Sequence, residues 1–139
     1  MLNALIIDDV DYIRKSLARL LESNKFECDV CANGKDAMEM VVAKKYDLII
    51  TDIMMPEADG YEFMEFLRAQ PDPLCRTPVL AISGGDKTIN SDVALTIMKK
   101  QADGVLQKPF GKDDLMKAIA KVLGNTRYNK TINGGPTDV

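Results

Sequence analysis

Short apolar runs alternate with longer amphipathic segments along most of the chain. The runs are residues 3–7, 26–30, 46–51, 79–82 and 104–106. Unbroken apolar runs of this length are typical of strands that are buried on both faces of a parallel sheet. The run at 26–30, FECDV, is more polar than the others, and this composition favours an edge strand.

Between these runs, apolar residues recur at the three- and four-residue spacing of helices that bury one face. The predicted helices follow Asp11, begin at Asp36, near Tyr61, near Ser91 and near Asp113, and the last ends at Gly124. We expect Asp11 to cap the first helix. The dipeptide Asn33-Gly34 predicts a turn, and the three prolines of 71–78 predict a loop without a helix interior or a central strand.

Five strands that alternate with five helices predict an α/β fold with right-handed crossovers. The expected architecture is a doubly wound five-stranded parallel sheet of order 2-1-3-4-5, flavodoxin-like, with helices on both faces. We assign residues 1–124 to this domain. The polar, glycine-rich residues 125–139 are predicted to be a flexible tail or the start of a linker.

The third run, LIITD, ends in Asp52, and the first ends in Asp8 and Asp9. In the predicted strand order these strands are neighbours, so the three carboxylates meet at the edge where open α/β sheets bind ligands. Ser83 and Lys108, which follow the fourth and fifth strands, lie close to the same edge. Any one of these residues alone fits a turn, a helix cap or a solvated charge.

Together, the five residues have the chemistry that a phosphoryl group requires. Clustered carboxylates repel one another, which raises some of their pKa values unless a cation is present. Mg²⁺ suits them, because it takes one or two carboxylates and keeps water and phosphate oxygens. Lys108 adds a positive charge and Ser83 a hydroxyl, while one carboxylate could attack phosphorus and carry the group as an acyl phosphate.

In these features the chain resembles a response-regulator receiver domain, from residue 2 to about residue 123. The resemblance rests on the acidic pair 8–9, the segment DIMMP with ADG after it, the serine that ends the fourth strand, and Lys108-Pro109. It implies that Asp52 is the phosphoacceptor and that Ser83 and Lys108 bind the phosphoryl group. It also implies a cis bond before Pro109.

The resemblance further implies a Mg²⁺ site. Asp9 and Asp52 would bind the ion directly, Asp8 largely through water, and Met54 through its backbone carbonyl. Two features depart from the family pattern. Val105 stands where the family often has the aromatic residue of its switch, and the segment between Ser83 and Lys108, which has Gly84-Gly85 after the serine, is slightly long.

Three functions of different kinds follow. The first is a phosphoacceptor that receives its phosphoryl group from a sensor histidine kinase or a histidine-phosphotransfer protein and then changes its binding to a downstream protein target. The chain could also be the receiver of a longer regulator with an output domain. The second is an interaction module that works without phosphate. The third is a phosphatase or flavin protein on a similar sheet, but the sequence lacks the D-x-D motif of the former and the phosphate loop of the latter.

The amino-acid composition argues against several other classes of function. The net charge of −3 is mixed along the chain, which gives no support for nucleic-acid binding. No stretch predicts membrane insertion or a secretory signal, so a cytoplasmic protein is expected. The chain has no histidine, which excludes Ser-His-Asp and Cys-His catalysis. Cys28 and Cys31 have C-x-x-C spacing but lie in a predicted strand, so we expect core thiols rather than a zinc or redox site.

Overall fold

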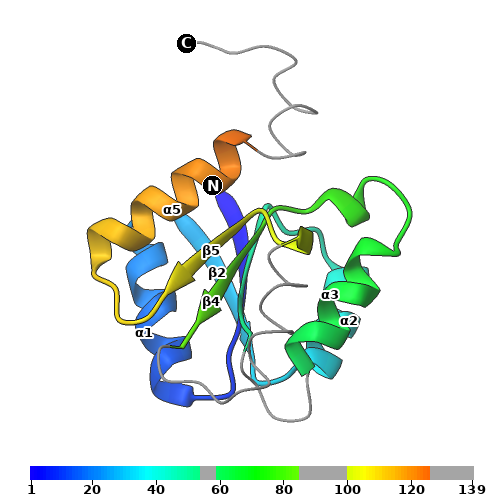
Figure 1. Cartoon of the computed structure of the whole chain (residues 1–139), viewed down its shortest axis with the longest axis horizontal. Coiled ribbons are helices and arrows are strands. Elements are labelled where there is room, and N and C mark those ends of the chain that lie inside the picture. Colours follow the sequence, from blue (N-terminus) through cyan, green and yellow to red (C-terminus); the bar gives the residue numbers. More distant parts are fainter. Residues whose placement is uncertain (54–58, 85–99, 126–139) are drawn as a thin grey trace.

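The computed structural model describes residues 1–53, 59–84 and 100–125. A five-stranded sheet of order β2-β1-β3-β4-β5, parallel at every pairing, lies at its centre (Figure 1). Its strands are β1 (Leu2–Ile7), β2 (Phe26–Cys31), β3 (Leu48–Asp52), β4 (Val79–Ser83) and β5 (Gly104–Gln107). The predicted fold class and strand order are therefore confirmed.

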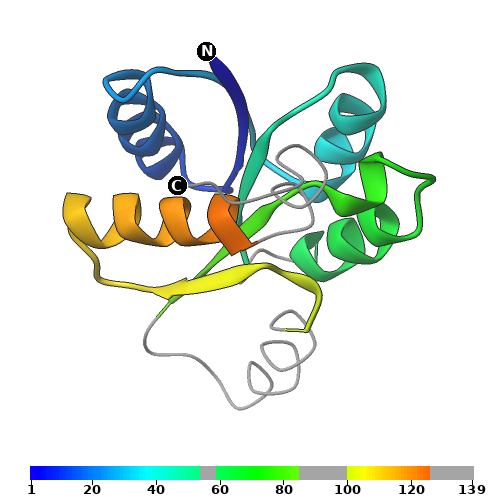
Figure 2. The same ribbon diagram turned by 90° about the horizontal axis from the view of Figure 1, so that it is seen from above.

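Helices cover both faces of the sheet. They are α1 (Asp11–Glu22), α2 (Gly34–Ala43), α3 (Asp59–Arg68) and α5 (Lys112–Asn125), with the short 3₁₀ turn η2 (Leu74–Arg76) before β4. Figure 2 shows α1 and α5 on one face and α2 and α3 on the other. The helix predicted near Ser91 lies outside the described residues.

The core has two parts because successive side chains of a strand point to opposite faces. In β1, Ala4 and Ile6 pack with α1 and α5, whereas Leu5 and Ile7 pack with α2 and α3. Every residue of β3 and β4 is buried. A strand that is apolar on both faces can be stable only between two helical layers, which explains the unbroken apolar runs of the sequence.

Two helix starts differ from the prediction. Val10, not Asp11, is the N-cap of α1, and its side chain makes no capping bond. Asp11 is the first residue of the helix, where its carboxylate pairs with Arg14 at 2.9 Å and Lys15 at 3.1 Å. Asn33 does not form a simple turn but caps α2, because its side-chain oxygen accepts the backbone N–H of Asp36 at 2.8 Å.

The central strand β3 begins at Leu48 rather than at residue 46. The backbone N–H of Asn3 donates to the Asp47 carboxylate at 2.8 Å, while the Asp47 N–H donates to the Asn3 carbonyl at 2.7 Å. The Asp47 side chain thus takes the place of a backbone carbonyl as the acceptor for Asn3, and the regular pairing of β1 with β3 starts at Ala4 and Leu48. The strand continues through Asp52, one residue beyond the predicted end.

Other element ends move by a few residues. The α2 helix begins at Gly34, two residues before the predicted start at Asp36, and ends at Ala43, where Lys44 is already extended. Both β4 and β5 run one residue further than predicted, and α5 ends at Asn125 instead of Gly124. These shifts do not change which side chains reach the carboxyl edge of the sheet.

Arg68, the last residue of α3, connects this helix to the segments that precede β4 and β5, at the amino ends of these strands. Its guanidinium donates to the carbonyls of Gln101, Cys75 and Thr77 at 2.9 Å and pairs with the Asp103 carboxylate at 3.2 Å. The side chains of Arg68 and Asp103 are only 13% and 9% exposed. Asp103 also accepts the backbone N–H of Val79 at 2.9 Å, so the pair fixes the entries to β4 and β5.

The cysteine pair of the C-x-x-C motif does not form a site. Cys31 packs in the core on the α2 and α3 face, whereas Cys28 packs against the core on the opposite face. Both thiols are free, and burial raises the pKa of each to about 11. The prediction that these thiols pack with the core is confirmed, with Cys31 buried and Cys28 partly buried.

Candidate phosphoryl-acceptor site

Asp8, Asp9 and Asp52 come together at the carboxyl edge of the sheet. Asp8 directly follows β1, Asp52 is the last residue of β3, and β1 and β3 are hydrogen-bonded neighbours. Each carboxylate offers an oxygen that lies within 4.8 Å of the others. Asp8 and Asp52 are buried, while Asp9 is exposed. The sequence thus predicted correctly that these three residues form one cluster.

Asp8 has one oxygen that the surrounding protein satisfies and one that it does not. Its Oδ1 accepts the backbone N–H of Val10 at 2.9 Å. Within residues 1–53, 59–84 and 100–125, its buried Oδ2 has no hydrogen-bond partner. Burial raises the pKa of Asp8 and the Asp52 charge raises it further, against the lowering effects of the Val10 bond and Lys108.

These properties fit a bound cation. A buried carboxylate oxygen without a donor is costly unless a positive group approaches it. Three carboxylates within one small cluster provide the hard oxygen ligands that Mg²⁺ prefers. The exposed position of Asp9 leaves a side of the cluster open to solvent.

Close backbone packing holds the end of β3 in place. The N–H of Ile53 donates to the Ile82 carbonyl at 2.9 Å, which continues the pairing with β4 beyond Asp52. A Cβ atom at Gly60 would lie 2.7 Å from the Asp52 carbonyl oxygen and 3.2 Å from that of Ile53. Glycine is therefore required for α3 to start this close to the acidic residue.

Ser83 and Lys108 lie at the adjacent ends of β4 and β5. The Lys108 N–H donates to the Ser83 carbonyl at 2.8 Å. Ser83 is buried, and its hydroxyl donates to the Gly84 carbonyl at 3.3 Å. The charge of Lys108 lowers the pKa of Asp8. The bond between Lys108 and Pro109 is cis, as the sequence resemblance implied.

Two further positions were singled out from the sequence: Met54 as a predicted site residue, and Val105 as a departure from the family pattern. Met54 lies outside the described residues, as does most of the long segment between Ser83 and Lys108. Val105 lies in β5 opposite Ala81 and is partly buried against the core on the α2 and α3 face. It contributes packing at this position rather than an aromatic ring.

A family model for the response regulator receiver domain matches residues 4–120. The chain belongs to this family. Receiver domains of two-component systems are signalling modules with a general phosphoacceptor role, and the family typically uses Mg²⁺. The sequence had indicated this family through motifs at the ends of four of the five strands.

Curated relatives of this receiver domain include the response regulator MprA of Mycobacterium leprae, which is 32% identical over 123 residues. The match covers 88% of this chain and 51% of the relative, so the chain spans about half the length of the curated relatives it matches. MprA of Mycobacterium ulcerans is 31% identical with the same coverage of this chain.

Solved structures support the same assignment. The chemotaxis response regulator CheY4 of Vibrio cholerae superposes with a TM-score of 0.75 at 28% identity, covering 88% of this chain and 98% of that one. The receiver domain of the Francisella response regulator 1452 gives a TM-score of 0.72 at 31% identity, with coverage of 88% and 97%. In both comparisons the match includes almost the whole of the solved protein.

Sequence reasoning did not assign a role to Gly60. The only signal was its place in ADG, which reads as a turn. The structure shows that the residue lies at the start of α3, against the backbone at the end of β3. The prediction would have required knowledge of the distance between two elements, which a turn motif does not contain.

Proposed function

We propose that Asp52 of this receiver accepts a phosphoryl group in a Mg²⁺-dependent reaction and that the modified domain changes its binding to a protein target. The observation that supports this most is the acidic cluster itself. Asp52 is buried beside Asp8, whose Oδ2 has no hydrogen-bond partner in the described part of the chain, and both lie within reach of exposed Asp9. A structural salt bridge or cap would not leave a buried carboxylate in this state.

In the proposed reaction, a carboxylate oxygen of Asp52 attacks the phosphorus of the donor. The new P–O bond forms as the bond from phosphorus to the donor breaks, and the donor leaves with that electron pair. The product on the protein is an acyl phosphate. Water attack on phosphorus later releases inorganic phosphate and restores the carboxylate. The chain thus undergoes self-phosphorylation and autodephosphorylation but transforms no other substrate.

The acidic residues would hold the ion and Asp52 would also be the nucleophile. Asp8, Asp9, Asp52 and the carbonyl of Met54 are the proposed ligands. A bound Mg²⁺ supplies charge neutralisation for the phosphoryl oxygens. Asp8 and Asp52 are 1% and 5% exposed, so the ion's charge would act in surroundings with little water to screen it.

Lys108 and Ser83 would bind the transferred group. The Lys108 ammonium compensates the negative charge that the phosphoryl group adds, and the Ser83 hydroxyl would exchange its contact with the Gly84 carbonyl for a phosphoryl oxygen. That contact, at 3.3 Å, is long for a hydroxyl donor and therefore easily replaced. Val105 has no ring to move in response, so the proposed signal does not use an aromatic switch at this position.

The proposed phosphodonors are a sensor histidine kinase or a histidine-phosphotransfer protein, and the proposed location is the cytoplasm. In the described ranges, the structure has no helix with the length and hydrophobicity needed to cross a bilayer. We assign residues 1–124 to the receiver and 125–139 to a tail or linker. The alternative is a receiver that belongs to a longer regulator with an output domain, which the greater length of the MprA relatives allows.

The proposal is tested by intact-mass spectrometry after incubation with acetyl phosphate, with and without Mg²⁺. We expect a gain of one phosphoryl group that requires both Mg²⁺ and Asp52. Asp52→Asn should abolish the gain, while the control Asp113→Asn, at an exposed position of α5, should retain it. Equal phosphorylation of Asp52→Asn would refute the assignment. No gain from acetyl phosphate or from any histidine-kinase donor would favour an interaction module that works without phosphate.

A further inference from the structure

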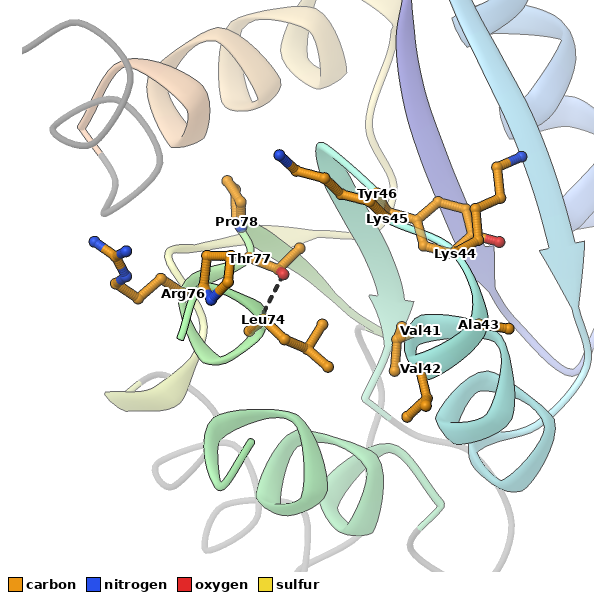
Figure 3. A pocket seen from close by; sticks show the side chains of 11 residues that line it. Val41, Val42, Ala43, Lys44, Lys45, Tyr46, Leu74, Arg76, Thr77 and Pro78 are labelled. Atoms are coloured by element: carbon orange, nitrogen blue, oxygen red, sulfur yellow. Dashed lines mark hydrogen bonds between the residues drawn. The ribbon is translucent and has the colours of Figure 1, made fainter. Parts of the chain in front are cut away.

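A pocket of about 300 Å³ lies at the amino ends of β3 and β4, whereas the acidic cluster lies at the carboxyl ends of the strands. Residues within 41–46, at the end of α2 and the entry to β3, form one side, and residues within 73–78, at η2 and the entry to β4, form the other (Figure 3). The length of β3 and β4 separates the pocket from Asp52 and Ser83. The phosphoryl site therefore does not account for it.

The walls of the pocket are largely apolar. Figure 3 shows Val41 and Val42 of α2 facing Leu74 of η2 across the opening, with Pro78 further along the rim. Val42 is 63% exposed, which is a high exposure for a branched apolar side chain beside a hollow. A concave apolar surface of this volume is at the lower limit of pockets that bind small molecules, roughly 300–1,000 Å³.

The charged residues of the lining are all cationic: Lys44, Lys45 and Arg76. Two of them already have partners, because Lys44 pairs with Asp29 at 2.9 Å and Arg76 with Asp72 at 3.2 Å. For Lys45 there is no ion pair among the residues that the structure describes. In Figure 3 its side chain points the other way from that of Lys44, toward the side of the pocket where Pro78 lies.

The polar groups of the walls are engaged within the protein. The Tyr46 hydroxyl donates to Asp29 at 2.7 Å, and the Thr77 hydroxyl donates to the Leu74 carbonyl at 2.8 Å. The site therefore offers an incoming molecule apolar contacts and one ammonium group. This combination suits an apolar body that carries a single negative charge.

We propose that this pocket binds a small organic anion with an aromatic or branched apolar body and one carboxylate or sulfonate group. The body would lie against Val41, Val42 and Leu74, and the anionic group would accept from Lys45. We favour a small molecule over a peptide because the pocket is a half-open hollow of about 300 Å³ between two short segments. The net charge of −3 for the whole chain makes a cationic lining a local feature rather than a general one.

The test is a titration of the full chain with naphthalene-2-carboxylate, followed by the backbone amide signals in two-dimensional NMR. We expect saturable shifts confined to residues 41–46 and 74–77. The neutral carboxamide of the same ring system should bind about tenfold more weakly, since it loses the charge-assisted bond. Lys45→Glu should weaken binding of the carboxylate by at least about tenfold and leave binding of the carboxamide unchanged.

Lys35→Glu is the matched control, because Lys35 is an exposed lysine at the other end of α2 and undergoes the same charge change. It should bind the carboxylate like the wild type. Asp52→Asn should also leave binding unchanged, so a failure of the proposed phosphoryl chemistry does not affect this test.

Four results would overturn the proposal. The first is shifts scattered over the surface, and the second is equal binding of carboxylate and carboxamide. The third is concentration-dependent broadening of the pocket signals without any probe, which would mean that a second copy of the chain covers this face. An acidic peptide that shifts the same signals more strongly than the small anion would likewise reassign the site to a protein partner.

Discussion

The substitution Asp8→Asn should have opposite effects on stability in the absence and presence of Mg²⁺. Asp8 and Asp52 are both buried and offer oxygens within 4.8 Å of each other. Two unit charges at that distance repel by about 1 kcal/mol in bulk water and about 3.5 kcal/mol at an effective dielectric constant of about 20. Lys108 offsets part of this repulsion. Asparagine removes the charge and keeps an oxygen for the Val10 N–H.

We therefore expect Asp8→Asn to stabilise the metal-free protein by about 1–2 kcal/mol at pH 7. Burial, followed by the charge of Asp52, raises the pKa of Asp8 above its ordinary value of 3.8. A carboxyl group whose pKa is raised in the folded state destabilises that state once the group ionises. The wild type therefore loses stability as the pH rises from about 3.8, the ordinary value, to the raised pKa of Asp8. The advantage of the variant should accordingly vanish as the pH falls below about 3.8.

With Mg²⁺ the order should reverse. A ligand at one hundred times its dissociation constant stabilises the folded protein by about 2.7 kcal/mol, and the variant should lose most of this gain. Urea unfolding measured at pH 7 in EDTA and in Mg²⁺ gives both free energies of unfolding. Asp9→Asn is the control: because Asp9 is exposed, its loss should weaken the response to Mg²⁺ with little effect on the metal-free protein. Destabilisation of the metal-free protein by Asp8→Asn, or an unchanged response to Mg²⁺, would refute this reasoning.

Other substitutions test the packing around the site. Arg68→Met should cost about 3–5 kcal/mol in the free energy of unfolding by urea, because it removes the guanidinium that pairs with the buried Asp103 carboxylate and donates to three carbonyls. A loss below about 1 kcal/mol would contradict this. Gly60→Ala should destabilise the folded protein by about 1–3 kcal/mol and slow phosphorylation. The control Gly124→Ala, whose Cβ meets nothing within 4 Å, should be neutral or stabilising. Equal effects of the two substitutions would show that the contact of Gly60 with β3 does not matter. Cys28 and Cys31 should alkylate slowly with iodoacetamide at pH 8, because at a pKa of about 11 only roughly one thiol in a thousand is ionised; labelling as fast as that of free cysteine would contradict their burial.

The fold was predictable because its signals are local and repeated. Each buried strand is a short apolar run, and acidic or polar residues end the runs at the edge where ligands bind. The strand order then brought Asp8 and Asp52 together without any knowledge of distances. The residues of the site could be proposed because each one ends a strand or stands within two residues after a strand end.

The sequence could not predict interactions between segments that are distant along the chain. Nothing near Arg68 indicates that its guanidinium ties η2 to the entry of β5, and nothing near Asp47 indicates that its carboxylate replaces a ladder partner of Asn3. Asp11 is a good candidate for the N-cap of α1 because aspartate is a preferred cap residue. In the structure it is instead the first residue of the helix, and its side chain pairs with two basic residues of that helix.

The most direct test of the account is to locate the phosphoryl group. The protein is incubated with acetyl phosphate and Mg²⁺ and then treated with borohydride, which reduces an aspartyl phosphate to homoserine, and the peptides are sequenced by mass spectrometry. The account predicts homoserine at position 52 and unchanged aspartate at positions 8 and 9. Homoserine at position 8 or 9, or at any residue away from the acidic cluster, would contradict it.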